Sequence, residues 1–334
     1  MFRAVRHWIL FALVGACAPA MAGAADVPAL PRHLRDTGLY AEGVLAFSPQ
    51  YPLWSDGAVK HRWIYLPPGA SIDATQPDAW DFPRGTKLWK EFRHGRALET
   101  RFIERTADGE WRFASYVWTA DGADAVLAPA AGIREMPAPE APGARYAIPA
   151  QDDCRACHEG APVPVLGFSA LQLSPDRDPL APHAESSAAE ANLRSLVDRG
   201  VLRNLSPELL ANPPRIKAAT PEGRAALGYL HGNCGHCHND EGPLAVLGMT
   251  LAQRVGSQEP AADAVLRSVV DVQSQFRGAG GGARVAPGHP ASSVVALRMR
   301  SREPTQQMPP LGSTVVDAEA MALIARWIES LPNP

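Results

Sequence analysis

Two short segments of the chain each place a pair of cysteines directly ahead of a histidine. They read Cys154-Arg-Ala-Cys157-His158 and Cys234-Gly-His-Cys237-His238. Within one helical turn, this spacing lets two thiols reach the two vinyl groups of a porphyrin, and the histidine can then ligate its iron. We therefore expect two covalently bound haem c groups, attached through the four cysteines, with His158 and His238 as iron ligands.

Zinc binding and thiol redox chemistry are the alternative uses of paired cysteines. A zinc site made of Cys154, Cys157, Cys234 and Cys237 would have to bring the two segments together, and it would leave both histidines unexplained. A thioredoxin-like motif requires a βαβ pattern, which surrounds neither pair. The only other cysteine is Cys17, so no pair remains for the structural disulfides that are common in exported proteins.

The first 25 residues indicate export from the cytoplasm. Arg3 and Arg6 precede a short apolar run, and Ala22-Gly23-Ala24 offers a small-residue cleavage site, so residues 1–25 are predicted to be a signal peptide. The apolar run is shorter than the roughly 20 residues that cross a bilayer, and we expect no transmembrane helix. The predicted location is the periplasm.

Cys17 gives a second interpretation of the same region. Val14-Gly15-Ala16-Cys17 resembles a bacterial lipoprotein box, in which the cysteine is acylated and becomes the mature N-terminus. Cys17 would then anchor the protein to the membrane through lipid, whereas cleavage near Ala25 would release it. A buried helix over the apolar run is a third possibility.

Aromatic residues gather between residues 44 and 120, which hold six of the eight tryptophans. Alternating patterns predict strands over 87–92, 100–105 and 111–118, and a turn at Ala107-Asp108-Gly109 joins the last two into a hairpin. We expect an antiparallel β domain, sandwich-like or barrel-like.

The boundaries of this β domain follow from composition. It is expected over residues 44–150, after a linker over residues 26–43. Within it, residues 128–143 are rich in Ala, Pro and Gly and predict a linker or a long connection over the surface.

Helical signals dominate the second half of the chain. Ala189 to Arg199 has apolar helical spacing, and Thr220 with Pro221 is typical of a helix start that runs into the second motif. Asp317 caps a last helix, whose buried face would hold Met321, Ile324, Trp327 and Ile328. The predicted fold class is α+β and multidomain: an antiparallel β domain, a first haem-binding segment over residues 151–217, and a mainly α-helical cytochrome c-like domain over residues 218–334.

The last of these parts resembles a class I cytochrome c domain. A helix leads into the second motif, Gln307-Met308-Pro309-Pro310-Leu311-Gly312 follows about seventy residues later, and a helix ends the chain. On that resemblance Met308 is the sixth ligand of the second iron, and its thioether raises the reduction potential. The stretch before Met308 is long and contains the glycine run 278–282, which indicates an inserted loop.

The sixth ligand of the first iron is less defined, because no Met-Pro pair follows the first motif. His183, 25 residues downstream, could fold back over the haem face, and Met136 lies before the motif. His183 could equally be a solvated loop histidine. Without a side-chain ligand the haem would be five-coordinate and open to peroxide or a small gas. Three arginines are candidate partners of haem propionates: Arg215, Arg284 and Arg298.

The whole chain is similar to a family of exported bacterial di-haem c-type cytochromes of unassigned function, with an aromatic β domain at the N-terminus and a cytochrome c-like domain at the C-terminus. The resembling segments are Tyr51-Pro52-Leu53-Trp54-Ser55-Asp56-Gly57, Leu66-Pro67-Pro68-Gly69, Tyr116-Val117-Trp118 and Asn233-Cys234-Gly235-His236-Cys237-His238. The resemblance implies the two haems and says little about a substrate.

We expect an electron-transfer protein, rather than a catalyst, that passes single electrons between periplasmic redox partners. The rival hypothesis is a di-haem peroxidase or oxidase with the first haem as its reactive centre; Asp153 and Glu159 flank that motif as acid-base candidates. A third hypothesis makes the tryptophans a binding platform. The net charge of −3 and pI near 6.4 argue against a nucleic-acid partner.

Overall fold

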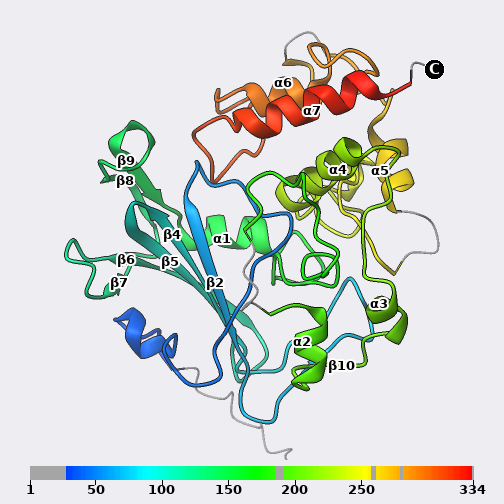
Figure 1. Cartoon of the computed structure of the whole chain (residues 1–334). Helices are drawn as coiled ribbons and strands as arrows, with labels where there is room; N and C mark the ends of the chain where they lie inside the picture. The colour runs from blue at the N-terminus through cyan, green and yellow to red at the C-terminus, as the bar shows by residue number, and fades with distance from the viewer. Residues whose placement is uncertain (1–27, 186–190, 257–260, 279–280, 333–334) are drawn as a thin grey trace, which may run out of the picture.

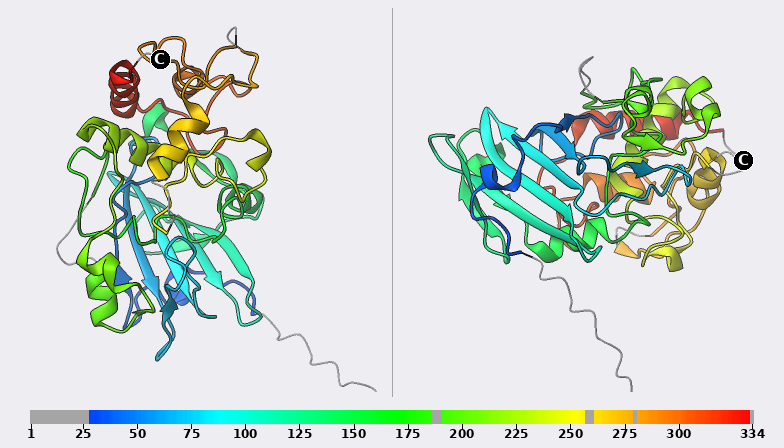
Figure 2. Two further views of the ribbon diagram at one scale, coloured as in Figure 1. Left: turned by 90° about the vertical axis from the view of Figure 1, so that its right-hand side faces the viewer. Right: turned by 90° about the horizontal axis from the view of Figure 1, so that it is seen from below.

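A computed structural model of the chain describes residues 28–185, 191–256, 261–278 and 281–332. Within that part of the chain the fold is mixed α+β, with one large antiparallel sheet and seven α-helices. The sheet lies on one side of the molecule and most of the helices on the other, with the helix of the first motif between them (Figure 1). Figure 2 shows the same division from two further directions.

The large sheet has six strands in the order β1-β2-β4-β5-β6-β7, and each pairs antiparallel with its neighbours. The expected hairpin of 100–118 is confirmed, because β5 and β6 pair along their length. The bounds of the six strands are β1 (Leu45–Ala46), β2 (Val59–Tyr65), β4 (Lys87–His94), β5 (Arg96–Arg105), β6 (Trp111–Trp118) and β7 (Ala125–Leu127).

Each face of the sheet is covered by a different part of the chain, since successive side chains of a strand point to opposite faces. Trp89 and Phe102 on one face pack with Leu34, which lies in the 3-10 helix η1 (Leu34–Thr37). On the other face the row of Ile64, Leu88, Ile103 and Phe113 packs with Phe168, Leu173, Leu193 and Leu196.

This covering explains two departures from the expected β domain. The six strands of the large sheet form an open sheet instead of a sandwich or a barrel, because loops and helices bury its faces and no second large sheet is needed. The region 26–43, expected as a linker, contributes Leu34 and Leu39 to the sheet's core, where they are buried.

The remaining strands form two small sheets. β8 (Ile133–Pro137) and β9 (Arg145–Ile148) pair as a hairpin around the short helix η2 (Pro142–Ala144), so residues 128–143 include regular structure that their composition did not predict. β3 (Ile72–Asp73) pairs in parallel with β10 (Leu202–Arg203) and joins the β region to the helices that follow.

The α-helices have the bounds α1 (Gln151–His158), α2 (Leu193–Asp198), α3 (Pro207–Ala211), α4 (Pro221–Cys234), α5 (Ala261–Val269), α6 (Val294–Arg300) and α7 (Ala318–Ser330). A 3-10 turn, η3 (Ala245–Leu247), follows the second motif. Two predicted helix starts are confirmed: the Thr220 hydroxyl accepts from Gly223 N at the start of α4, and the Asp317 carboxylate accepts from Ala320 N at the start of α7.

Helices α4 and α7 share one hydrophobic core, in which the predicted apolar face of the last helix is buried. The signal peptide 1–25, Cys17 and residues 279–280 of the glycine run lie outside the described residues. Among the helices that are described, none is long and apolar enough to cross a bilayer.

Candidate functional site

The first motif forms the helix α1. The Asp153 carboxylate accepts a hydrogen bond from Ala150 N at 2.9 Å, which satisfies a free donor at the start of the helix. Cys154 packs against the sheet face that holds Phe113. The two cysteines and His158 are thereby held next to the large sheet.

The orientation of His158 leaves one ring nitrogen available. Its Nδ1 lies 2.6 Å from Pro164 O, and its ring packs on Phe113 with the centroids 5.2 Å apart. A carbonyl oxygen only accepts, so Nδ1 carries the proton and Nε2 keeps its lone pair. Burial lowers the pKa of His158 to about 4, which keeps the imidazole neutral. This tautomer and orientation are what an iron ligand requires.

The second motif begins at the last residue of α4, Cys234. His238 is fixed by its backbone, since Leu251 N donates to His238 O at 2.8 Å. Its Nδ1 is buried and has no hydrogen-bond partner among the described residues. A buried imidazole nitrogen without a partner is costly, and His238 lacks the carbonyl partner that fixes the ring of His158.

The four cysteines of the motifs are free thiols. Burial raises the pKa of Cys154 and of Cys237 to about 11 and that of Cys234 to about 12, so they are protonated at neutral pH. In the described ranges no group of three or more His, Cys, Asp or Glu side chains could hold a metal ion, and the zinc alternative gains no support.

The two motifs touch each other through glycine. A Cβ atom on Gly160 would lie 2.9 Å from His236 O and 3.7 Å from the Cα of Cys237. On the other side, the Asn239 amide donates to Gly160 O at 2.8 Å, and a Cβ on Gly242 would lie 2.3 Å from the same oxygen. The backbone after the first motif therefore lies directly against the second motif.

This contact was not predicted from the sequence. Gly160 and Asn239 each follow a motif within two residues. This nearness to a motif is the only feature of the sequence that could have pointed to them. A glycine at a close backbone approach has no side-chain pattern of its own.

Met308 and the second motif line the same cleft. Cys234 lines this cleft together with Met308. Trp54, Met299, Pro309 and residues from α4 and α7 line it as well. The Met308 backbone is fixed by its N–H, which donates to Arg298 O at 3.0 Å. This placement agrees with Met308 as a ligand of the second iron, which stays a prediction, and Met299 lies in the same wall.

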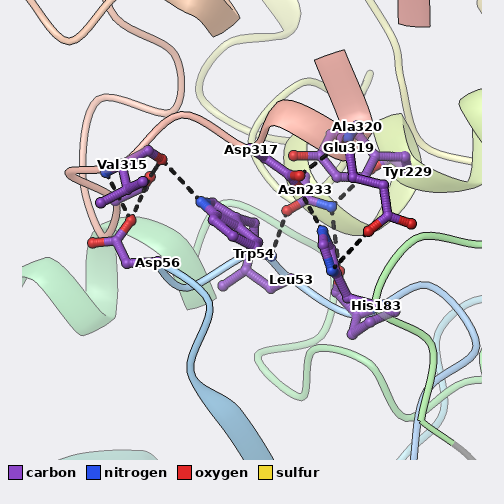
Figure 3. A network of polar contacts seen from close by, with 12 residues as sticks. Leu53, Trp54, Asp56, His183, Tyr229, Asn233, Val315, Asp317, Glu319 and Ala320 are labelled. Atoms are coloured by element: carbon purple, nitrogen blue, oxygen red, sulfur yellow. Dashed lines mark hydrogen bonds and ion pairs between the residues drawn. The ribbon is translucent and has the colours of Figure 1, made fainter. Parts of the chain in front are cut away.

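His183 makes its contacts away from the first motif. Its Nε2 lies 2.9 Å from the Asp317 carboxylate, its Nδ1 lies 3.6 Å from Glu319, and its ring packs on Trp54 at 4.8 Å (Figure 3). The loop thus brings His183 to the start of α7, away from Cys154 and His158. Met136 packs in a small cluster with Leu98.

The segment 51–57 connects the sheet to the second half of the chain. Two glycines one turn apart on α4, Gly228 and Gly232, leave room for Tyr51: a Cβ on Gly228 would lie 2.0 Å from its ring. Trp54 donates from its backbone to the Asn233 side chain at 2.6 Å and from its indole to Val315 O at 3.0 Å (Figure 3). The segment thereby reaches the cleft of Met308.

Asp56 fixes the loop that follows Met308. Its carboxylate accepts from the backbone N–H groups of Thr314 and Val315 and from the hydroxyls of Ser313 and Thr314, at 2.7 to 3.0 Å. Asp56 has a φ of 52°, a left-handed conformation that Asp, Asn and Gly tolerate. No pattern in the sequence indicates this long-range contact.

Removing this carboxylate should loosen the loop. We expect Asp56→Gly, which keeps the backbone unstrained, to lower the free energy of unfolding by about 2 kcal/mol, the value of hydrogen bonds to a charged group. Urea denaturation measures the change. Asp56→Asn keeps one acceptor oxygen and should lose about half as much; equal stability of all three proteins would contradict the role of Asp56.

The three arginines proposed for haem propionates have protein partners. Arg215 lies 3.3 Å from Asp176. Arg284 donates to the carbonyls of residues 247, 248 and 268, and Arg298 donates to Gln306 O and lies over the Phe276 ring. Both of the latter lie near enough to His238 to lower its pKa, after burial as the main cause, whereas Arg215 pairs elsewhere.

Comparison of the chain with protein-family models, with curated proteins and with solved structures found no match.

Proposed function

We propose that this protein is a di-haem c-type cytochrome that passes single electrons between redox partners. The observation that carries the proposal is the contact of Gly160, two residues after the first Cys-x-x-Cys-His segment, with His236 inside the second. Haems attached to segments in direct contact lie close together, as electron exchange between them requires. The haem irons would supply the one-electron chemistry, and the protein sets their ligands, burial and orientation.

The residues of each motif have separate tasks in this proposal. Cys154, Cys157, Cys234 and Cys237 would hold the two porphyrins by thioether bonds. His158, oriented by Pro164 O, would ligate the first iron, and His238 would ligate the second. Met308 would be the second side-chain ligand of that iron, from the cleft that it shares with Cys234.

We also propose that residues 218–334 are a cytochrome c-like domain. The support is the packing of α4 with α7 in one core and the presence of Cys234 and Met308 in one cleft. With a thioether on one iron alone, the second haem would have the higher potential and would draw electrons from the first.

A di-haem peroxidase is the alternative function, and one observation favours it. His183 is held by Asp317 at the start of α7, which leaves the sixth position of the first iron without its predicted ligand. Against it, both candidate acid-base groups are engaged: Asp153 caps α1, and Glu159 pairs with Arg155 at 2.9 Å. Electron transfer needs no such group and is the better supported function.

The proposed setting is the periplasm, with soluble or membrane-bound redox proteins as donor and acceptor. The signal peptide would deliver the chain there, and acylation of Cys17 would add a lipid anchor.

Rapid photoreduction of the oxidised, haem-loaded protein tests the proposal. We expect one electron to reach the first haem and then move to the second within the molecule, at a rate independent of protein concentration. A rate that rises in proportion to concentration would show exchange between molecules and would contradict electron transfer between adjacent haems.

A further inference from the structure

Four cationic side chains lie on one face of the large sheet. The register pairs Arg62 of β2 with Lys90 of β4, and Lys90 with Arg101 of β5, so these three form a row across the strands. Lys60 is two residues from Arg62 on the same face and is the diagonal neighbour of Lys90. We call these four residues the cation row.

The cation row lies beside the first motif. The adjoining row on the same face ends at Phe113, whose ring contacts both His158 and the Arg155 guanidinium. Cys154 packs against this hydrophobic row. The cation row therefore lies next to α1, along the surface on which the first motif rests.

The two guanidinium groups of the row have carboxylate neighbours. Arg101 donates two hydrogen bonds to Glu99, at 2.9 and 3.1 Å. Glu99 is fully buried and also accepts from Ser115 and Tyr146, so its acceptor sites are filled. Arg62 lies 3.9 Å from Glu185.

The two lysine side chains, Lys60 and Lys90, form no ion pair with a carboxylate of the described residues; Glu185 and Glu99 act on them only from a greater distance. Lys60 is buried, and its Nζ donates to a backbone carbonyl, Leu53 O, at 3.0 Å. The Lys90 ammonium lies over the Phe92 ring at 4.9 Å and makes no hydrogen bond or ion pair with a described residue. Burial first, and then neighbouring cations, lower the pKa of both lysines, that of Lys60 to about 8, although Glu185 raises the pKa of Lys60 and Glu99 that of Lys90 in part.

Two neighbouring lysines that lack an ion pair and are largely shielded from water are unfavourable as cations unless an anion joins them. Ionisable groups that are perturbed by burial and by neighbouring charges are candidates for a ligand site. Two adjacent ammonium groups suit a ligand with two carboxylates.

We propose that the cation row is a binding site for a pair of carboxylates, with Lys60 and Lys90 as the residues that recognise them. One source of such a pair is the two propionates of a haem held by the neighbouring motif, and this source rests on the proposed function. The other source is a free dicarboxylate, which would bind whether or not haem is attached.

The test compares Lys90→Gln with Lys87→Gln in the full-length, haem-loaded protein. Lys87 is on the same strand, faces the opposite side of the sheet and interacts with Thr37 O and Glu104, so it controls for the loss of one lysine from β4. Resonance Raman spectroscopy reports the propionate bending band, and calorimetry with succinate as the probe reports binding of a free dicarboxylate.

If haem propionates occupy the site, Lys90→Gln shifts the propionate band, Lys87→Gln leaves it in place, and succinate does not bind. If a free dicarboxylate occupies it, succinate binds to the unmodified protein and its Kd rises about tenfold or more in Lys90→Gln alone. A Lys90→Gln protein that equals Lys87→Gln in both measurements overturns the proposal. A chain without covalent haem would overturn the proposed function, yet the succinate titration would still decide the cation row.

Discussion

Replacing both cysteines of the first motif, Cys154→Ser with Cys157→Ser, should halve the covalently bound haem and leave the second haem in place. Each thioether forms when a thiol adds across a vinyl double bond, with sulfur bonded to one carbon and hydrogen to the other. Serine hydroxyls do not replace the thiols in this addition. Pyridine haemochrome absorption of acid-extracted protein measures the covalent haem per chain.

The matched control is the corresponding change in the second motif, Cys234→Ser with Cys237→Ser. It should also leave one covalent haem per chain, now without any spectroscopic sign of methionine ligation. Because the two segments are in contact through Gly160, we expect each double variant to be less stable than the unmodified protein as well. Two covalent haems in either double variant would contradict the assignment of the motifs.

Met308→Ala is expected to have the second large effect. It removes the thioether from the cleft that Met308 shares with Cys234, so the methionine-to-iron charge-transfer band at the red end of the visible spectrum should disappear. The reduction potential of that haem should fall by an amount on the order of 0.1 to 0.3 V, within the roughly 0.8 V range that axial ligands set. Optical redox titration measures both changes in one experiment.

Met299→Ala is the control for this prediction, because Met299 lies in the wall of the same cleft. It should keep the charge-transfer band and most of the potential. The reverse result, in which the band survives Met308→Ala and is lost in Met299→Ala, would show that Met299 is the ligand and would contradict the prediction.

Local patterns in the sequence predicted much of the secondary structure. The strands over 87–118 alternate between a buried aromatic face and a second face, and this period of two residues does not depend on the rest of the fold. The starts of α4 and α7 were predicted from Thr220 and Asp317, whose side chains cap the helix within three residues. Such interactions join residues that are close in the sequence, so the sequence pattern alone predicts them.

Contacts between distant segments were not predictable in the same way. Trp54 and Asp56 lie more than 170 residues from their partners Asn233 and Thr314. A tryptophan and an aspartate at these positions would fit a solvent-exposed turn as well as hydrogen bonds to a distant segment. The strand pattern likewise did not show that loops would cover both faces of the sheet, which made a sandwich or barrel the expected form.

His183 illustrates the same limit within the candidate site. A histidine in a proline-flanked loop can ligate iron, but its conformation is decided by the strongest partner within reach. Here that partner is the buried carboxylate of Asp317, at 2.9 Å. The four cations of the cation row also required the strand register, because they come from three strands that are adjacent only in the folded sheet.

The intact mass of the exported, matured protein under denaturing conditions tests the central claim most directly. We expect the mass of the processed polypeptide plus two haems, which remain bound because thioether bonds survive unfolding. The mass of the polypeptide alone, or of the polypeptide with a disulfide within each Cys-x-x-Cys pair, would contradict the account.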